Sequence, residues 1–297
     1  MQSNKDSTGD ILKKVRRIEL KTRGLSNQIF SGQYHSAFKG RGMAFSEVRE
    51  YMPGDEIRTI DWNVTARFNQ PFVKVFEEER ELTVILIVDV SASYNFGTQE
   101  KLKRNLITEL CAVLSFSAIQ NNDKIGVIFF SEKVEKFIPP KKGKSHILRI
   151  IRELIDFEPE QKGTNIAEAL RYFNNAIKKR SIAFLISDFQ DEKPFKDALR
   201  LANQRHDLVS LQIKDSREEK LPKVGLLPLE DPETGEWHWV DSSSKKTRTE
   251  YEKNALRFNE KLHKLFKKNG VDYTELYTDR SYVAPLINLF KKRSLHA

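Results

Sequence analysis

The chain has 297 residues, of which 39% are hydrophobic, so it can bury a core as one large domain or as a domain with a smaller companion. Its single cysteine, Cys111, excludes an internal disulfide and a zinc site built from several cysteines, and we expect it in a helix as a small apolar residue. No stretch approaches the roughly 20 apolar residues of a membrane helix, and the N-terminal residues lack the apolar core of a signal peptide. We therefore expect a cytoplasmic protein without a membrane span.

The net charge of +9 is unevenly placed, because residues 245–297 hold 13 Lys and Arg against 6 Asp and Glu. These charges surround apolar residues at helical spacing, such as Leu262, Leu265 and Phe266, which is typical of a solvated helix face. No nucleic-acid-binding motif accompanies them, so we expect no nucleic-acid partner. A basic nucleic-acid-binding protein remains an alternative that depends on charge alone.

The first 80 residues differ from the rest of the chain. Residues 10–30 predict an amphipathic docking helix, and residues 31–80, broken by glycines and prolines, predict short strands and turns that end in a strand over 72–76. Within them, residues 51–61 predict a Pro-Gly turn followed by a charged strand. Because this part has little core of its own, we expect residues 1–80 to form an extension packed on a main domain of residues 81–297.

From Leu82 onward, apolar runs alternate with helical patterns, which predicts a parallel sheet with helices on both faces. The polar stretch 215–245 interrupts this order and predicts an inserted hairpin with strands over 224–229 and 236–240. The remaining expected strands cover residues 82–88, 124–130, 134–138, 182–187, 207–213 and 271–277. The expected helices cover residues 99–120, 145–156, 165–178, 195–204, 249–268 and 281–292.

The central feature is the run Leu82 to Val88, which is uncharged and rich in Val and Ile, as expected of a strand buried on both faces. It ends in Asp89, and Ser91 and Ser93 follow at alternate positions, so an extended chain would point all three side chains the same way. Carboxylate and hydroxyl oxygens at the carboxyl end of a parallel strand suit a hard cation such as Mg²⁺.

Two other loops are also expected to place oxygen-bearing side chains at this edge of the sheet. The apolar strand over 182–187 ends in Asp188, and a glycine turn delivers Thr164 just before a helix. Each alone would be an ordinary cap or turn. Together with the Asp89 loop they supply two carboxylates and three hydroxyls from three loops at one edge of a sheet, which predicts a metal site.

This set resembles the metal-ion-dependent adhesion site (MIDAS) of von Willebrand factor type A domains, in residue type and in order along the chain. The resemblance implies a six-stranded, mostly parallel α/β sheet with one antiparallel edge strand, for which residues 134–138 are the natural candidate. It also implies that Mg²⁺ or Mn²⁺ is bound by five residues, namely Asp89, Ser91, Ser93, Thr164 and Asp188.

A second group of motifs lies mainly in the N-terminal part: Gly40-Arg-Gly42, Phe45-Ser-Glu47-Val-Arg49, Tyr51-Met-Pro53-Gly54-Asp55, Arg58-Thr-Ile60-Asp61-Trp62, Ala66-Arg67 and, near the C-terminus, Thr278-Asp-Arg280-Ser-Tyr282-Val-Ala-Pro285-Leu286. These motifs resemble the signature of a bacterial family known as domain of unknown function 58, which precedes a type A domain. The resemblance implies partnership with MoxR-type AAA+ ATPases that assemble or mature other proteins. From the residues themselves, one interpretation is an ion-pair network of Asp55, Arg58, Asp61 and Arg67 around Trp62, for which we favour a structural brace between the N-terminal part and the sheet over a catalytic role.

Two classes of function remain. The ligand types favour a non-enzymatic module whose metal accepts an acidic residue from a partner, and the resemblance implies that this partner is an ATPase or its client. The rival is a Mg²⁺-dependent phosphohydrolase with Asp89 as nucleophile, but such enzymes usually have a second carboxylate close behind the first, where this chain has Ser91, and a dedicated lysine. Gly143-Lys144-Ser145 lacks the first glycine of a phosphate-binding loop, and no Gly-x-Ser-x-Gly elbow is present, so we expect no catalytic residues.

Overall fold

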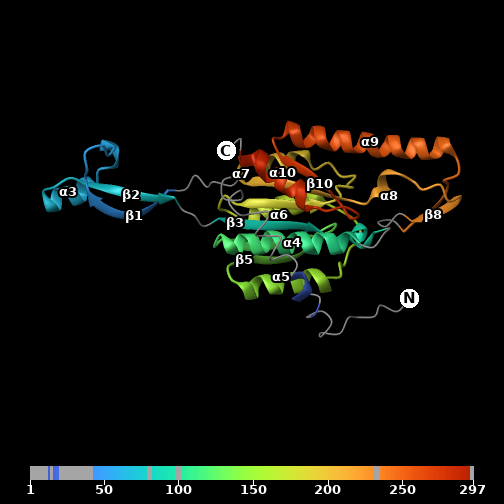
Figure 1. Cartoon of the computed structure of the whole chain (residues 1–297), viewed down its shortest axis with the longest axis horizontal. Helices are drawn as coiled ribbons and strands as arrows, with labels where there is room; N and C mark the ends of the chain where they lie inside the picture. Colours follow the sequence, from blue (N-terminus) through green and yellow to red (C-terminus); the bar gives the residue numbers. More distant parts are fainter. Residues whose placement is uncertain are drawn as a thin grey trace. The chain divides into compact units, whose positions relative to one another are not determined.

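The computed structural model describes residues 13, 16–19, 43–78, 82–97, 102–230 and 235–294 (Figure 1). The chain forms two compact units, one comprising Met1–Phe38 with Thr83–Ala297 and the other Lys39–Leu82. Of the helix expected over residues 10–30, the described residues 13 and 16–19 are helical, and the others lie outside the described residues.

The large unit contains a six-stranded sheet in the order β10-β7-β6-β3-β4-β5, in which only β5 runs antiparallel to its neighbour. This confirms the expected sheet and its antiparallel edge strand. The strands are β3 (Thr83–Asp89), β4 (Lys124–Phe130), β5 (Val134–Lys141), β6 (Ile182–Ser187), β7 (Asp207–Lys214) and β10 (Asp272–Tyr277). The helices are α4 (Lys103–Gln120), α5 (Lys144–Asp156), α6 (Ile166–Ala176), α7 (Lys196–Arg205), α9 (Lys245–Lys268) and α10 (Val283–Ser294).

Helices cover both faces of this sheet, as the uncharged strands require (Figure 1). On one face, α6, α7 and α9 contribute side chains such as Phe173 and Phe266 to the same core cluster as the odd-numbered Ile85 and Ile87 of β3. On the other face lie α4, with α5 beside it, and α10, whose Phe290 meets Phe184 of β6 at 6.4 Å between ring centroids. Cys111 is buried within α4, as expected. The core therefore fixes the strand ends, and the loops that follow them, in one position.

The inserted hairpin also forms. After β7 the chain makes the short helix α8 (Ser216–Glu219) and then the antiparallel strands β8 (Leu226–Glu230) and β9 (Trp237–Asp241). It belongs to the large unit and returns directly into α9.

The small unit pairs β1 (Met43–Glu50) with β2 (Phe72–Glu78) in antiparallel fashion, which confirms the strand expected near residue 72. The expected charged strand before Asp61 is wrong, because residues 57–59 form a short 3-10 turn, η1 (Ile57–Thr59). The helix α3 (Trp62–Phe68) follows, and the side chain of Asp61 caps it by accepting from the backbone N–H groups of Asn63 and Val64.

The predicted ion-pair network around Trp62 is also wrong. Asp55 instead accepts two hydrogen bonds from the Arg49 guanidinium, at 2.7 and 2.8 Å, and Asp61 lies 3.5 Å from the ammonium of Lys74. The indole of Trp62 is 67% exposed, so no charged shell encloses it.

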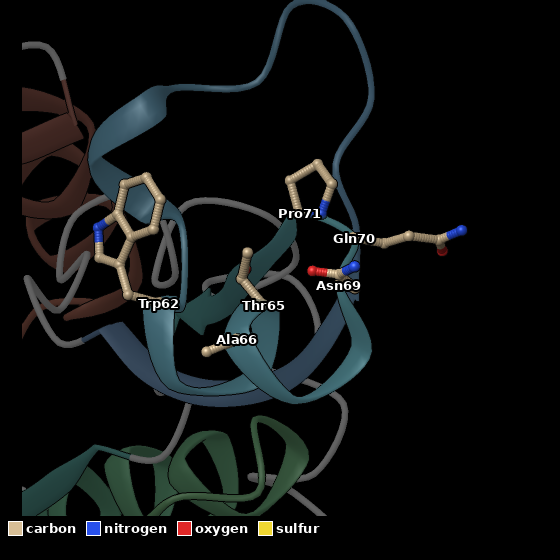
Figure 2. A pocket seen from close by; sticks show the side chains of 6 residues that line it. All are labelled: Trp62, Thr65, Ala66, Asn69, Gln70 and Pro71. Atoms are coloured by element: carbon tan, nitrogen blue, oxygen red, sulfur yellow. The ribbon is translucent and has the colours of Figure 1, made fainter.

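A shallow pocket of about 280 Å³ lies on the small unit where α3 turns into β2 (Figure 2). Its lining contains no titratable group and is formed by Trp62, Thr65, Ala66, Asn69, Gln70 and Pro71. It therefore has neither the acid and base groups of a catalytic site nor the carboxylates of the predicted metal site.

Candidate functional site

The predicted metal-site residues lie on loops that meet at the carboxyl edge of the large sheet. Strands β3 and β6 are neighbours and run parallel, with Val88 in register with Ile186, so Asp89 and Asp188 leave the sheet side by side. The Thr164 loop is fastened to the same place, because the backbone N–H of Ala92 donates to the carbonyl of Lys162 at 2.9 Å.

Asp89 is held by its own loop and by the end of β6. One carboxylate oxygen accepts from the backbone N–H of Ser91 at 3.0 Å, and the other accepts from the hydroxyl of Ser187 at 2.6 Å. The chain does not stay extended as the alternation suggested, because it turns into the 3-10 helix η2 (Ala92–Asn95). This turn still brings the hydroxyl oxygens of Ser91 and Ser93 to 3.2 Å from each other.

Asp188 has a different set of partners. One oxygen accepts from the backbone N–H of Gln190 at 3.1 Å, and the other accepts from the ammonium of Lys103 at 2.9 Å. Burial opposes ionisation of Asp188, but the Lys103 charge outweighs it and lowers the pKa of this carboxyl. Burial and the nearby negative charge of Asp188 together raise the pKa of Asp89 to about 7.

Lys103, at the start of α4, is the residue that sequence reasoning missed. It is 1% exposed, and its ammonium also donates to Glu218 of α8 at 2.6 Å. Burial alone would lower its pKa, yet the two carboxylates raise it, so it stays charged. A sequence signal does exist, because Lys103 stands three and four residues before Leu106 and Ile107, on the face of α4 that is buried.

The arrangement fits a hard divalent cation. With all groups ionised, Asp89, Asp188 and Glu218 outweigh Lys103 by two negative charges, and the hydroxyls of Ser91 and Ser93 add neutral oxygen ligands. Burial raises the pKa of Asp89, and the negative charge of Asp188 raises it further, so a cation bound beside these carboxylates would favour their ionised forms. Within the described ranges, no group of three or more His, Cys, Asp or Glu converges, so hydroxyl groups would have to complete the ligand shell.

A mostly parallel six-stranded sheet with an antiparallel edge strand, carrying Asp-x-Ser-x-Ser at the end of β3, defines a domain of the von Willebrand factor type A class. A family model described as protein of unknown function DUF58 matches residues 47–261, and the chain therefore belongs to this family.

The chain is also similar to individual proteins and solved structures. The uncharacterized protein Rv1480 of Mycobacterium tuberculosis is 27% identical over 281 residues, covering 94% of this chain and 88% of its own length. Among solved structures, an aerotolerance-related membrane protein from Bacteroides fragilis is 14% identical, covers 73% of this chain and 100% of its own, and has a TM-score of 0.49. The SpRpn10 VWA domain is 10% identical, covers 70% of this chain and 94% of its own, and has a TM-score of 0.40.

None of the helices in the described part of the chain combines the length and the apolar character needed to cross a membrane.

Proposed function

We propose that this protein is a metal-dependent protein-binding module, in which Mg²⁺ or Mn²⁺ at the carboxyl edge accepts an acidic side chain from a partner. The observation that carries the proposal is that the carboxylates of Asp89 and Asp188 lie close to each other and to the hydroxyls of Ser91 and Ser93. Buried like charges are costly unless a positive charge compensates them, so this edge favours a cation.

The choice of ligands supports binding. Hydroxyl oxygens donate no charge, so a cation held by Ser91, Ser93, Thr164 and the two carboxylates would remain able to attract a further carboxylate. Membership of the DUF58 family supports a MoxR-type AAA+ ATPase, or a client of that ATPase, as the partner. The acidic residue would come from an exposed loop of that partner.

The test is a binding titration between purified chain and a MoxR-type ATPase of the same organism, with Mg²⁺ or with EDTA. We expect binding in Mg²⁺ that EDTA abolishes and that Ser91→Ala and Thr164→Ala weaken. Ser117→Ala is the matched control, because Ser117 is also fully buried but lies near the far end of α4. Equal affinity with and without the metal would contradict the proposal.

One observation favours a second candidate, the phosphohydrolase. Lys103 supplies the buried lysine that this class requires and that sequence reasoning did not find. Against it, the Lys103 ammonium already donates to both Asp188 and Glu218. Turnover of p-nitrophenyl phosphate in Mg²⁺ that Asp89→Asn abolishes would establish the enzyme, and we expect no such turnover.

A further inference from the structure

The β8–β9 hairpin presents one face that nothing in the described structure covers. Its register pairs Leu226 with Asp241, Pro228 with Trp239 and Glu230 with Trp237, and directly opposite residues share a face. All six side chains on this face are exposed. The other face is less open, since Leu227, Leu229 and Val240 are half-buried.

The exposure on this face is large for apolar side chains. Trp237, Trp239 and Leu226 are 60%, 67% and 62% exposed, and Val224 just before the hairpin is also open. Tryptophan offers a large apolar area that is held by only two side-chain torsions, so it contributes strongly when a partner covers it. Contiguous apolar surface of this kind marks an interaction site.

The negative charge of the hairpin indicates the charge of the partner that it would bind. Residues 224–244 contain five acidic residues and no Lys or Arg, on a chain whose net charge is +9. On the exposed face, Glu230 and Asp241 lie at opposite ends of the apolar strip, about 14 Å apart by strand rise. Such a face repels the phosphates of nucleic acids and anionic lipids, and it attracts basic side chains.

The base of the hairpin is firmly anchored, so the face is presented in a defined position. The buried Ser242 donates from its hydroxyl and its backbone N–H to the carbonyl of Gly225, at 2.6 and 2.8 Å, and accepts from Arg248 of α9 at 2.6 Å. On its other side, α8 is tied to the carboxyl edge through Glu218 and Lys103. Figure 1 shows β8 beyond the end of the sheet at which α8 lies.

We propose that the exposed face of β8–β9 is a second docking surface, which takes a segment of a partner protein that carries an apolar residue between two Lys or Arg residues. The apolar residue packs on Trp239 and Pro228. The basic residues pair with Glu230 and Asp241, and a guanidinium can also stack on Trp237. This surface needs no metal, so it goes beyond the site proposed above and does not depend on it.

The chain itself offers two other occupants, of which the basic N-terminal segment is the less suitable. The basic segment around residues 10–30 has the required composition, but Glu19 is paired with Lys144 at 2.5 Å, at the start of α5. Because β5 runs antiparallel and ends opposite Ile125, the start of α5 lies at the other edge of the sheet. A second copy could offer α9, which is basic and exposes Leu256 and Phe258, and this remains an outcome that the test detects.

The experiment is selection of binders from a random displayed peptide library on the full-length chain in EDTA, followed by titration of the selected peptides. We expect selected sequences enriched in Lys and Arg around an apolar residue, whose affinity falls about tenfold or more in Trp237→Ala/Trp239→Ala and in Glu230→Lys/Asp241→Lys. The matched controls are Trp62→Ala, with the same exposed fraction as Trp239, and Glu260→Lys, an exposed acid on α9. Both controls should leave the affinity unchanged.

Selected peptides without basic enrichment, or peptides that bind the hairpin variants as tightly as the wild type, would overturn the proposal. Concentration-dependent sedimentation of the chain alone that Trp237→Ala/Trp239→Ala abolishes would overturn it in favour of a second copy. Because the selection is run in EDTA, its result is independent of whether the carboxyl edge binds a metal.

Discussion

At the carboxyl edge of the sheet, charged side chains are buried and almost fully paired, whereas on the β8–β9 hairpin the tryptophan side chains are exposed in the described part of the chain. Folding removes the charged groups of Asp89, Lys103 and Asp188 from water. The stability of the fold therefore depends on their interactions with one another. The side chains of Trp237 and Trp239 remain mostly exposed to water, so they contribute little to the stability of the fold. A change at the edge should therefore alter stability as well as binding, while a change on the hairpin should alter binding alone.

The largest effect is expected at Lys103. Lys103→Met removes the only ammonium that the described contacts place between Asp188 and Glu218, and leaves these carboxylates uncompensated. Breaking a buried pair in this way costs about 3–5 kcal/mol of unfolding free energy. Urea unfolding in EDTA measures it. The control Lys133→Met removes an ammonium paired with Glu160 on the exposed surface, where solvent screens the pair and the loss of stability should be much smaller. Equal losses in the two variants would show that Lys103 does not hold the edge together.

Metal binding should give the next largest effect. A cation that binds only the folded chain stabilises it by about 2.7 kcal/mol when its concentration is a hundred times its dissociation constant. Thermal melts of the wild type with Mg²⁺ should therefore shift upward, and the double variant Ser91→Ala/Ser93→Ala should lose most of this shift. Ser117→Ala should retain it. An unchanged shift of the melting temperature in the double variant would show that the metal binds elsewhere on the chain.

The pH dependence of stability follows from Asp89. Its pKa is raised to about 7 in the folded chain, against about 3.9 in an unfolded chain. The folded chain therefore keeps a proton that the unfolded chain releases, and this contribution to stability is lost as the pH rises from about 4 to 7. In EDTA, we expect Asp89→Asn to gain stability relative to the wild type between pH 5 and pH 8, which urea unfolding at several pH values measures. If the difference in unfolding free energy between Asp89→Asn and the wild type stayed constant across this pH range, the raised pKa of Asp89 would be contradicted.

Much of the sheet could be predicted from sequence because its signals are local. The run that forms β3, and the apolar runs that form β4 and β6, are uncharged or nearly so over their whole length, and the structure places these strands within a residue of the expected bounds. A carboxylate directly after such a run has to lie at a strand end. This is why Asp89 and Asp188 could be placed at one edge before the fold was known.

Other features could not be predicted, because their causes are either distant in sequence or unusual in composition. Lys103 and Asp188 are 85 residues apart, and no local pattern shows that a lysine at the start of an apolar helix will meet a carboxylate after β6. Helix α3 begins Trp-Asn-Val-Thr, all modest helix formers, so its capping by Asp61 had to be seen in the structure. Whether the extension packs on the main domain stays a prediction.

The smallest stability effect is expected on the hairpin, and it sharpens the contrast between the two regions. Trp239→Ala removes a side chain that is 67% exposed, so the unfolding free energy should change by no more than about 0.5 kcal/mol. The buried Phe266 of α9 is the reference, since Phe266→Ala should cost about 3–5 kcal/mol. Urea unfolding measures both variants. A loss for Trp239→Ala that approaches the loss for Phe266→Ala would mean that the tryptophan stabilises the fold, and then weaker peptide binding by hairpin variants would no longer identify a docking surface.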